Sequence, residues 1–318
     1  MSVLSTFAVL AVTMALIGVG HLLARHRVLT TARNHTLAAL LTDAAFPLLC
    51  LSRIGAMSGP LLRARVAIPL LMGGVLVLGA LVGEVGARLL GLGSEARRSV
   101  RFCVAMPNWI FLPLPIVLWR YGAPGAQVVL LGNVGAQFFL WTVGVLLLAG
   151  RSAENPLRVL ARNMGLWGTA AGIGLALSGL TYPSGDVFRV LRWCVDRFGE
   201  SAVWLTPVTV GAQLFGSTVT TVDRAVASVL ASRLVVMPLV VAALLALVAA
   251  LGLGGLDPLT REVVLLISAM PVAFSAGALA LRFGADATLA ARGVFLSTVL
   301  SLVSVPLVEA VARTIFFR

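Results

Sequence analysis

The sequence has 318 residues, of which 59% are hydrophobic and 11% are charged. Its mean hydropathy of +1.03 excludes soluble enzymes and soluble binding domains, because ordinary globular domains carry roughly 25% charged residues. The net charge is +12, and the basic residues are all arginines, scattered singly between apolar runs. That pattern is typical of helix-end anchors in a membrane protein and not of a nucleic-acid-binding surface, which needs a clustered basic patch.

Apolar runs of bilayer-spanning length follow one another along the chain, separated by short polar connections. The first run has no basic residue before it and no clear cleavage site, so it predicts a first span and not a removed signal peptide. We therefore expect an all-α polytopic membrane protein. Ten spans are predicted, at residues 3–23, 36–55, 66–88, 100–120, 125–149, 163–180, 190–214, 226–251, 261–282 and 287–312.

Two phrases of the first half recur in the second. Ala105-Met106-Pro107 returns as Ala269-Met270-Pro271, and Arg120-Tyr121-Gly122-Ala123 returns as Arg282-Phe283-Gly284-Ala285. Pro47 and Pro69 also have counterparts at a similar offset, Pro207 and Pro238. The most polar junction, Arg151 to Asn163, divides the chain into repeats of five spans at 1–150 and 151–318. Because five is odd, the second repeat is expected to be inverted in the membrane.

The distribution of arginines predicts the orientation of the chain. With the N-terminus outside, the inner side receives the larger share, beginning with Arg25, Arg27 and Arg33 in the first loop and including Arg233. Loops near the N-terminus often dominate the positive-inside rule. We expect a multi-pass protein of the inner (plasma) membrane with both termini outside, because the number of spans is even.

The proline of each repeated phrase lies inside a predicted span. Proline removes a backbone donor and clashes with the preceding turn, and in lipid the freed carbonyls need other partners. The run from Pro107 to Pro115 holds three prolines in nine residues, which predicts a break in the fourth span. Two inverted halves, each with a broken helix, predict a secondary transporter whose half-helix N-termini face an anionic substrate near mid-membrane. The alternative is that both prolines are packed kinks.

Polar residues inside spans are the candidate site residues. Asn108 follows the first break and is expected to donate to a carboxylate; the alternative is an amide that only caps the broken helix. Asn133 and Gln213 are further intramembrane amides, which either bind ligand or knit helices together. Asp43 is a candidate for proton coupling; the alternative is an interfacial aspartate paired with a loop arginine such as Arg33.

The remaining charged residues in or beside spans favour structural roles. Glu84 and Arg88 are spaced i,i+4 on one helix and predict an ion pair. Arg120 and Arg282 close the two repeated phrases and are expected to snorkel to the headgroups.

Enzymatic and metal-dependent chemistry is not indicated. The three cysteines, Cys50, Cys103 and Cys194, are far apart and form no CxxC pair. The histidines all lie in the first 35 residues without a carboxylate pattern. No HExxH, paired intramembrane aspartates or serine-nucleophile motif occurs. We expect neither a cofactor nor a bound metal, and no enzyme activity.

Several stretches resemble the auxin efflux carrier family of membrane transporters, with a likeness to bacterial members and to the plant auxin carriers. They cover nearly the whole chain. The stretches are Met106 to Leu148 (MPNWIFLPLPIVLWRYGAPGAQVVLLGNVGAQFFLWTVGVLLL), Ala269 to Leu307 (AMPVAFSAGALALRFGADATLAARGVFLSTVLSLVSVPL), Ala202 to Leu214 (AVWLTPVTVGAQL) and Pro47-Leu48-Leu49.

The resemblance implies an architecture like that of bile acid/sodium symporters and Na⁺/H⁺ antiporters. Two inverted repeats of five spans would cross at the breaks of spans four and nine. Spans 1, 2, 6 and 7 would form a scaffold at a homodimer interface, and spans 3–5 and 8–10 a transport domain that moves like an elevator.

The resemblance also assigns site residues. Asn108, after Pro107, matches the family's asparagine that contacts the substrate carboxylate, and Gln137, four residues before Trp141, matches a glutamine that faces the same site. Cys50 stands where the family has a serine, and Val272, after Pro271, where plant members often have a polar residue. These two departures weaken the match to an auxin-like pose.

Together these features predict an elevator-type transporter of small organic anions, either auxin-like carboxylates or dicarboxylates. Its partners would be the substrate, the bilayer, a second copy of the chain and a proton, which Asp43 favours over Na⁺. The alternatives are a sodium-coupled organic anion symporter of the bile-acid type and a transporter-like ligand sensor without flux.

Overall fold

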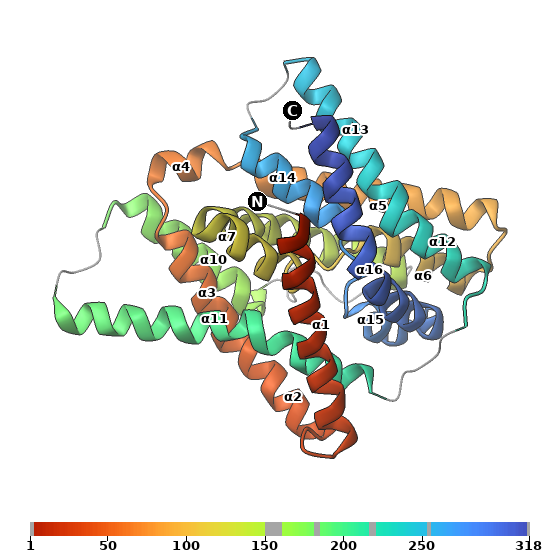
Figure 1. The fold of residues 1–318 in the computed structure, drawn as a ribbon, viewed down its shortest axis with the longest axis horizontal. Coiled ribbons are helices and arrows are strands. Elements are labelled where there is room, and N and C mark those ends of the chain that lie inside the picture. Colours follow the sequence, from red (N-terminus) through yellow and green to blue (C-terminus); the bar gives the residue numbers. More distant parts are fainter. Residues whose placement is uncertain (1–2, 150–160, 181–184, 216–220, 253–255, 317–318) are drawn as a thin grey trace.

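The structure is a computed structural model that describes residues 3–149, 161–180, 185–215, 221–252 and 256–316. These residues form helices joined by short connections (Figure 1). No sheet occurs within these ranges, where the isolated β-type contact is a bridge between Pro107 and Val272. The predicted all-α fold is therefore confirmed. The predicted boundary between the halves, at residues 150 and 151, lies outside the described residues.

The first half holds α1 to α8, with π-helical turns inside two of its apolar stretches. The π-helical turns are Leu41–Ala45, between α2 and α3, and Leu140–Gly144, between α7 and α8. The helices are α1 (Val3–Arg25), α2 (Thr31–Leu40), α3 (Phe46–Gly55), α4 (Gly59–Ala64), α5 (Ile68–Leu89), α6 (Ser94–Ala105), α7 (Pro113–Phe139) and α8 (Val145–Ala149).

The second half contains long helices, α11 and α16, and one apolar stretch interrupted by a π-helical turn. A π-helical turn, Ser232–Val236, joins α12 to α13. The helices are α10 (Met164–Ser178), α11 (Asp186–Leu214), α12 (Arg224–Ala231), α13 (Met237–Ala250), α14 (Pro258–Ser268), α15 (Ala276–Arg282) and α16 (Ala287–Phe316).

Side-chain caps fix where several helices begin. Thr30, Asn163, Asp223 and Asp257 each precede a helix and accept a hydrogen bond from the backbone N–H three residues on, at 2.9–3.4 Å. These are the residue types that satisfy the free N–H groups of a first turn. The polar connections between the apolar runs therefore start α2, α10, α12 and α14.

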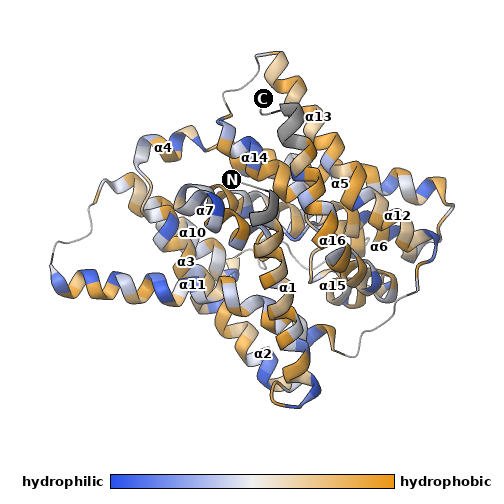
Figure 2. Cartoon of the chain, viewed as in Figure 1, coloured by the Kyte–Doolittle hydropathy of each residue, from blue (hydrophilic) through white to orange (hydrophobic). Residues whose placement is uncertain are grey.

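The described residues contain six helical stretches long and apolar enough to cross a membrane. A seventh apolar helix, α10, has only 15 residues. The chain is thus a multi-pass membrane protein, and Figure 2 shows hydrophilic residues gathered mainly at helix ends and in the first half of α11. The six stretches are Phe7–Arg25, Thr31–Gly55, Gly59–Leu89, Pro113–Leu148, Arg224–Ala250 and Ala287–Val311.

The predicted break after Met106 is present, but its three prolines do not act alike. Pro107 lies in the non-helical segment, whereas Pro113 and Pro115 lie in the first turn of α7. Proline is tolerated there because the N–H groups of a first turn have no intrahelical partner. A sharp bend at Gly122, with φ +61°, then separates the first two turns of α7 from its longer second part.

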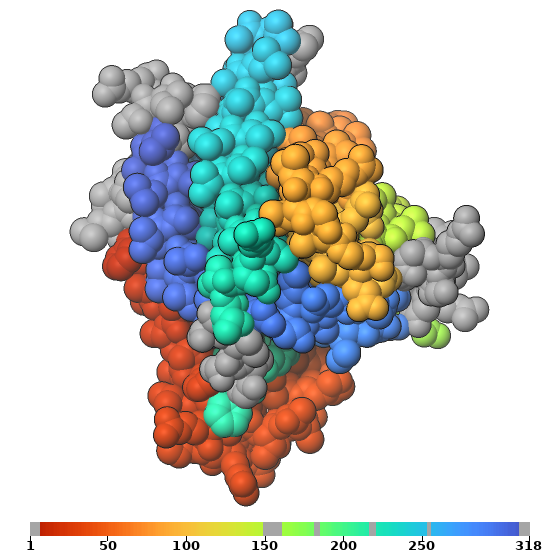
Figure 3. Space-filling view, turned by 90° about the vertical axis from the view of Figure 1, so that its right-hand side faces the viewer, coloured from red at the N-terminus to blue at the C-terminus, as the bar shows by residue number. Residues whose placement is uncertain are grey.

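The helices pack into two groups. In one, α1 lies along α11, and α3 packs against both α10 and α11. In the other, α5 packs on α6 and α7, α12 on α6 and α16, and α14 on α7 and α13. Figure 3 shows the α12–α13 column running over the surface between α5–α6, in orange, and α16, in blue. The contacts between the groups run chiefly through α7 and α16.

Candidate functional site

Two interrupted helices cross at the centre of the site. The segment 106–112 follows α6 and the segment 269–275 follows α14; we call their meeting point the crossover. The Asn108 amide N donates to the Pro271 carbonyl O at 2.7 Å, and the Ala273 amide N donates to the Met106 carbonyl O at 2.9 Å. The chain runs antiparallel here, and Pro107 pairs with Val272. The breaks thus satisfy each other's backbone groups, as lipid requires.

Ser297 of α16 supports the second break. Its Oγ accepts a hydrogen bond from the Val272 amide N at 3.0 Å, and the side chain is completely buried. Val272, which stands where a polar residue was expected from the family pattern, therefore contributes its backbone N–H to the packing of the crossover.

Arg233 holds the other face of the crossover. Its Nη1 donates to the Val104 carbonyl O at 2.7 Å, its Nε to the Met270 carbonyl O at 3.2 Å, and its Nη2 to the Ser268 carbonyl O. Arg233 is completely buried, so its predicted place at the inner surface is wrong. The signal in the sequence was an arginine in the middle of an apolar run, since an ionisable residue inside a span is functional by default.

A cavity of about 290 Å³ opens against the crossover; we call it the crossover cavity. Both helix groups contribute to its wall, and none of the lining residues in the described part of the chain carries a charge. Five of them are aromatic. The lining residues are Thr42, Phe46, Pro107, Asn108, Trp109, Ile110, Phe111, Gln137, Leu140, Trp141, Asn163, Gly165, Ala273, Phe274 and Ser275.

The two ends of the Asn108 side chain have different surroundings. Its Oδ1 accepts a hydrogen bond from the Phe111 amide N at 3.0 Å, just before α7 begins. Its Nδ2 is buried and has no hydrogen-bond partner in the described structure. The Phe111 contact fixes the orientation of the amide. Asn108 therefore holds the turn that leads into α7, whose own N-cap, Leu112, has no side-chain hydrogen bond, so the hypothesis of a capping amide is wrong; its unused N–H pair belongs to a residue that lines the cavity.

A chain of amides and indoles backs the cavity on the α7 side. The Trp141 indole N donates to Gln137 Oε1 at 3.1 Å, and Asn133 Oδ1 accepts from the Trp109 indole N at 3.1 Å and from Gln137 Nε2 at 3.4 Å. Gln137 lines the cavity, whereas Asn133 lies behind it, with its Nδ2 buried and unpartnered. The structure thus brings Asn108 and Gln137 to one cavity.

Other predicted site residues lie away from this wall. Pro271 forms the crossover without lining the cavity, and Cys50 is buried where α3 packs on α10. Gln213 is exposed at the end of α11. Asp43 is exposed one residue from Thr42, which lines the cavity, and no ion pair in the described part of the chain includes it.

Arg120 contradicts the prediction that it snorkels to the headgroups. Its side chain is 5% exposed and forms an ion pair with Glu309 of α16, with Glu262 of α14 a further partner at 3.7 Å. Tyr121 donates to the same Glu262 carboxylate. The cluster joins the first part of α7 to α14 and α16. The predicted Glu84–Arg88 pair is confirmed at 2.5 Å, and Arg97 and Arg101 join it.

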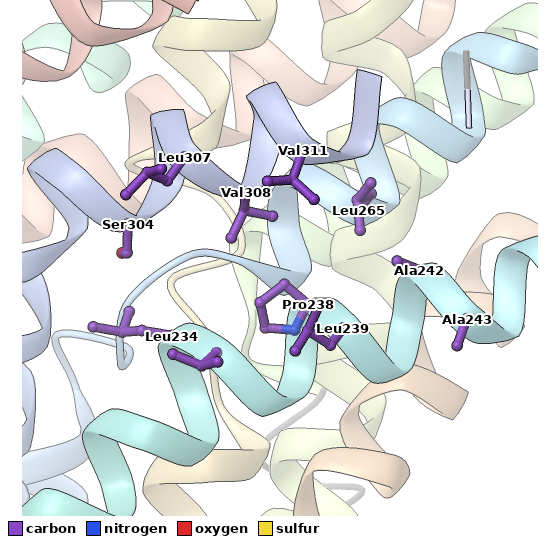
Figure 4. Close-up of a pocket in the computed structure, with 11 residues that line it drawn as sticks. Leu234, Pro238, Leu239, Ala242, Ala243, Leu265, Ser304, Leu307, Val308 and Val311 are labelled. Carbon is purple, nitrogen blue, oxygen red and sulfur yellow. The ribbon is translucent and has the colours of Figure 1, made fainter. Parts of the chain in front are cut away.

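A second cavity, of about 310 Å³, lies between α13, α14 and α16. Figure 4 shows its aliphatic lining, with Leu234, Leu265, Leu307 and Val308 around the opening and Ser304 as the hydroxyl-bearing residue. Its described lining residues offer no amide or charged side chain to an anion. The crossover cavity is therefore the better candidate for a substrate site.

Comparison with known proteins agrees with this architecture. A family described as membrane transport protein, Mem_trans, matches residues 5–159 and 169–308. An uncharacterized transporter from Methanothermobacter thermautotrophicus is 28% identical over 311 residues, which cover 95% of this chain and 97% of the relative. Mem_trans is a family of transporters and not of enzymes. With the family matching nearly its whole length, the chain belongs to the Mem_trans family of membrane transport proteins, the auxin efflux carrier family.

Proposed function

We propose that the protein is a secondary transporter of small organic anions that bind in the crossover cavity through one carboxylate. The observation that carries this proposal is Asn108, which lines the cavity and whose amide nitrogen is buried and has no hydrogen-bond partner in the described structure. An amide N–H pair can donate to a carboxylate without the cost of burying a second charge. The N-terminus of α7, immediately beyond, adds a positive dipole end.

The cavity lining favours a substrate with an apolar body. Phe46, Trp109, Phe111, Trp141 and Phe274 supply aromatic surface, and the described residues of the wall include no arginine that could hold a second carboxylate. Of the two substrate classes that the sequence predicts, these features favour an auxin-like aromatic monocarboxylate over a dicarboxylate. Gln137 would orient the substrate from the α7 side of the cavity.

The helix packing supports an elevator-type movement. We propose ten spans in two inverted repeats, with α6 and the start of α7 as the fourth span and α14 with α15 as the ninth. The group of α1, α3, α10 and α11 would be the scaffold, and the group around the crossover the transport domain. The cavity lies between them, because Phe46 and Gly165 come from one group and Asn108 and Phe274 from the other. Movement of one group along the other would expose the site alternately.

We propose that transport is coupled to a proton and not to Na⁺. Asp43, exposed one residue from Thr42 of the cavity wall, is the proposed residue for proton coupling. A dedicated Na⁺ site needs several convergent oxygens, and the sequence shows no obvious cluster of them. We place the protein as a homodimer in the plasma membrane with both termini outside.

Currents in proteoliposomes on membrane-supported electrodes test the proposed function. Jumps of aromatic monocarboxylates, aliphatic monocarboxylates and dicarboxylates would be applied with and without Na⁺ and a pH gradient. We expect a current with aromatic monocarboxylates that is lost in Asn108→Ala and depends on the pH gradient. Isotope counterflow would detect an electroneutral exchange.

The matched control is another buried asparagine. Asn34 donates to the Thr209 carbonyl O at 3.1 Å, away from the cavity, so Asn34→Ala should lower stability and leave substrate preference unchanged. Binding without flux in the folded protein would favour the ligand sensor over the transporter, and strict Na⁺ dependence would favour the sodium symporter. If the folded protein showed no binding and no flux with every carboxylate tested, the proposed substrate class would be overturned.

A further inference from the structure

A helix that is interrupted at a site presents a C-terminal end and an N-terminal end to that site. These two ends carry partial charges of opposite sign. The C-terminal ends of α6 and α14 reach the crossover at Ala105 and Ser268. Each helix end carries roughly half an elementary charge, positive at the N-terminus and negative at the C-terminus. Two C-terminal ends beside a carboxylate site would repel the anion that the N-terminus of α7 attracts. A protein that uses such a crossover for anions has to neutralise the C-terminal ends.

Arg233 contacts those two ends and no carboxylate. Its three carbonyl partners are Val104, in the last turn of α6, and Ser268 and Met270, at and just beyond the end of α14. These three carbonyl groups have no N–H donor within a helix, because the helices are interrupted there. None of the ion pairs in the described part of the chain includes Arg233. Its charge is therefore balanced by helix carbonyls alone.

Arg233 lies deep in the protein, where its positive charge acts strongly on the two helix ends. Arg233 lies ten residues after Asp223, the cap of α12, which corresponds to about 15 Å along a helix and about half the hydrocarbon thickness. The side chain is completely buried. At this depth water does not screen it, and burying a cation is expensive unless its donors are satisfied. The planar guanidinium, with its fixed fork of donors, can reach two helix ends at once, which a lysine ammonium cannot.

We infer that Arg233 is a positioning residue that gives the crossover its preference for anions, by neutralising the C-terminal ends of α6 and α14 together. This inference rests on the proposed function. One positive charge matches two helix ends of roughly half a charge each, so the positive N-terminus of α7 and the Asn108 N–H pair are left to act on the substrate. Arg233 is not among the residues that line the crossover cavity, so it would act on the substrate only through the two helix ends.

The test compares a carboxylate with a neutral ligand of the same shape. Binding of phenylacetate and phenylacetamide to the purified protein would be measured in wild type, Arg233→Gln and Arg233→Lys. We expect wild type to prefer phenylacetate, and Arg233→Gln to lose this preference by about tenfold, the scale of a helix-end interaction in a buried site. Arg233→Lys keeps a charge that reaches one helix end, so it should keep part of the preference near neutral pH.

A pH series keeps the test decisive if Arg233→Gln does not fold. A buried lysine gives up its proton far more readily than an arginine, so the preference of Arg233→Lys should fall as the pH is raised, while that of wild type stays constant. A merely structural role would change stability and leave both the preference and its pH profile unchanged. Arg120→Gln is the matched control, because Arg120 is also buried but pairs with carboxylates away from the cavity.

The outcomes separate the two proposals. An unchanged preference in folded Arg233→Gln, or a flat pH profile in Arg233→Lys, would overturn the role of Arg233 and leave the transporter proposal standing. A wild-type protein that does not distinguish phenylacetate from phenylacetamide would overturn the anion site itself. Loss of preference in Arg120→Gln as well would mean that the effect is general destabilisation, and it would also overturn the role of Arg233.

Discussion

At the scale of single residues, the crossover cavity depends on how one amide is oriented. Asn108 accepts from Phe111 with its oxygen and leaves its nitrogen for a ligand. The same side chain thus holds the turn before α7 and forms the proposed substrate contact.

Asn108→Asp separates the two roles. The new carboxylate still accepts from the Phe111 amide N, so the start of α7 should persist, but it replaces the N–H pair with a negative charge facing the substrate. We expect flux of aromatic carboxylates to be lost near neutral pH with little loss of thermal stability, measured by counterflow and by unfolding in detergent.

Acidification supplies the control for this variant. A protonated carboxyl group regains one O–H donor, so flux in Asn108→Asp should recover in part as the pH falls, whereas Asn108→Ala should stay inactive. Full activity of Asn108→Asp at neutral pH would contradict the proposed contact with a substrate carboxylate.

At the scale of helices, close crossings of α1 with α11 depend on glycine at two reciprocal positions. A Cβ added to Gly211 would overlap the carbonyl oxygen of Ile17, and a Cβ added to Gly20 would overlap that of Val208. Small residues at such contacts let helix backbones approach, which is how helices associate in a bilayer where the hydrophobic effect between them is absent. The α1–α11 contact is therefore set by backbone fit.

Gly211→Ala and Gly174→Ala form a matched pair that tests this point. Gly174 of α10 has no atom within 4 Å of an added Cβ. We expect Gly211→Ala to lower the free energy of unfolding by about 1–3 kcal/mol, as overpacking does. Gly174→Ala should be neutral or stabilising by up to about 1 kcal/mol, because alanine is the better helix former. Thermal unfolding in detergent would distinguish them, and equal effects would contradict the close-packing account.

At the scale of the whole molecule, the two helix groups meet in a contact that movement would have to break. Gln127 of α7 donates to the Arg53 carbonyl O of α3 at 3.0 Å, and Arg65 donates to Gln127 Oε1 at 3.4 Å. Arg53 is itself paired with Glu200 of α11. The contact thus links α3 and α11 on one side to the α5–α7 group on the other.

Cross-linking across this contact tests the elevator proposal. In a variant without Cys194, the pair Arg53→Cys and Gln127→Cys would be bridged with a short thiol reagent. We expect flux to stop on cross-linking and to return on reduction, with substrate binding preserved, since the bridge would hold two groups that have to slide. Flux would be measured by counterflow on the same sample before and after the reagent.

A second pair within one group is the control. His21 and Phe215 join α1 to the end of α11, with ring centroids 5.1 Å apart, so bridging His21→Cys to Phe215→Cys should leave flux intact. Continued transport after cross-linking Arg53→Cys to Gln127→Cys would contradict relative movement of the two groups.

The sequence by itself determined the class of fold and the place of the breaks. Hydropathy and proline act locally: an apolar run of about 20 residues spans a bilayer wherever it lies, and a proline interrupts a helix whatever it contacts. The repeated phrases around Pro107 and Pro271 therefore located the crossover, and Asn108 and Gln137 could be singled out before their cavity was known.

Only the tertiary structure decided which side chains meet. Arg233 was counted among inner-side arginines and Arg120 among snorkelling ones, yet both are buried, because carbonyls or carboxylates from distant helices satisfy them. Cys50 and Gln213 lie in spans as Asn108 does, but helix packing turns them away from the cavity. A side chain's partners depend on how spans pack against one another, and that arrangement is a property of the whole molecule that no local pattern encodes.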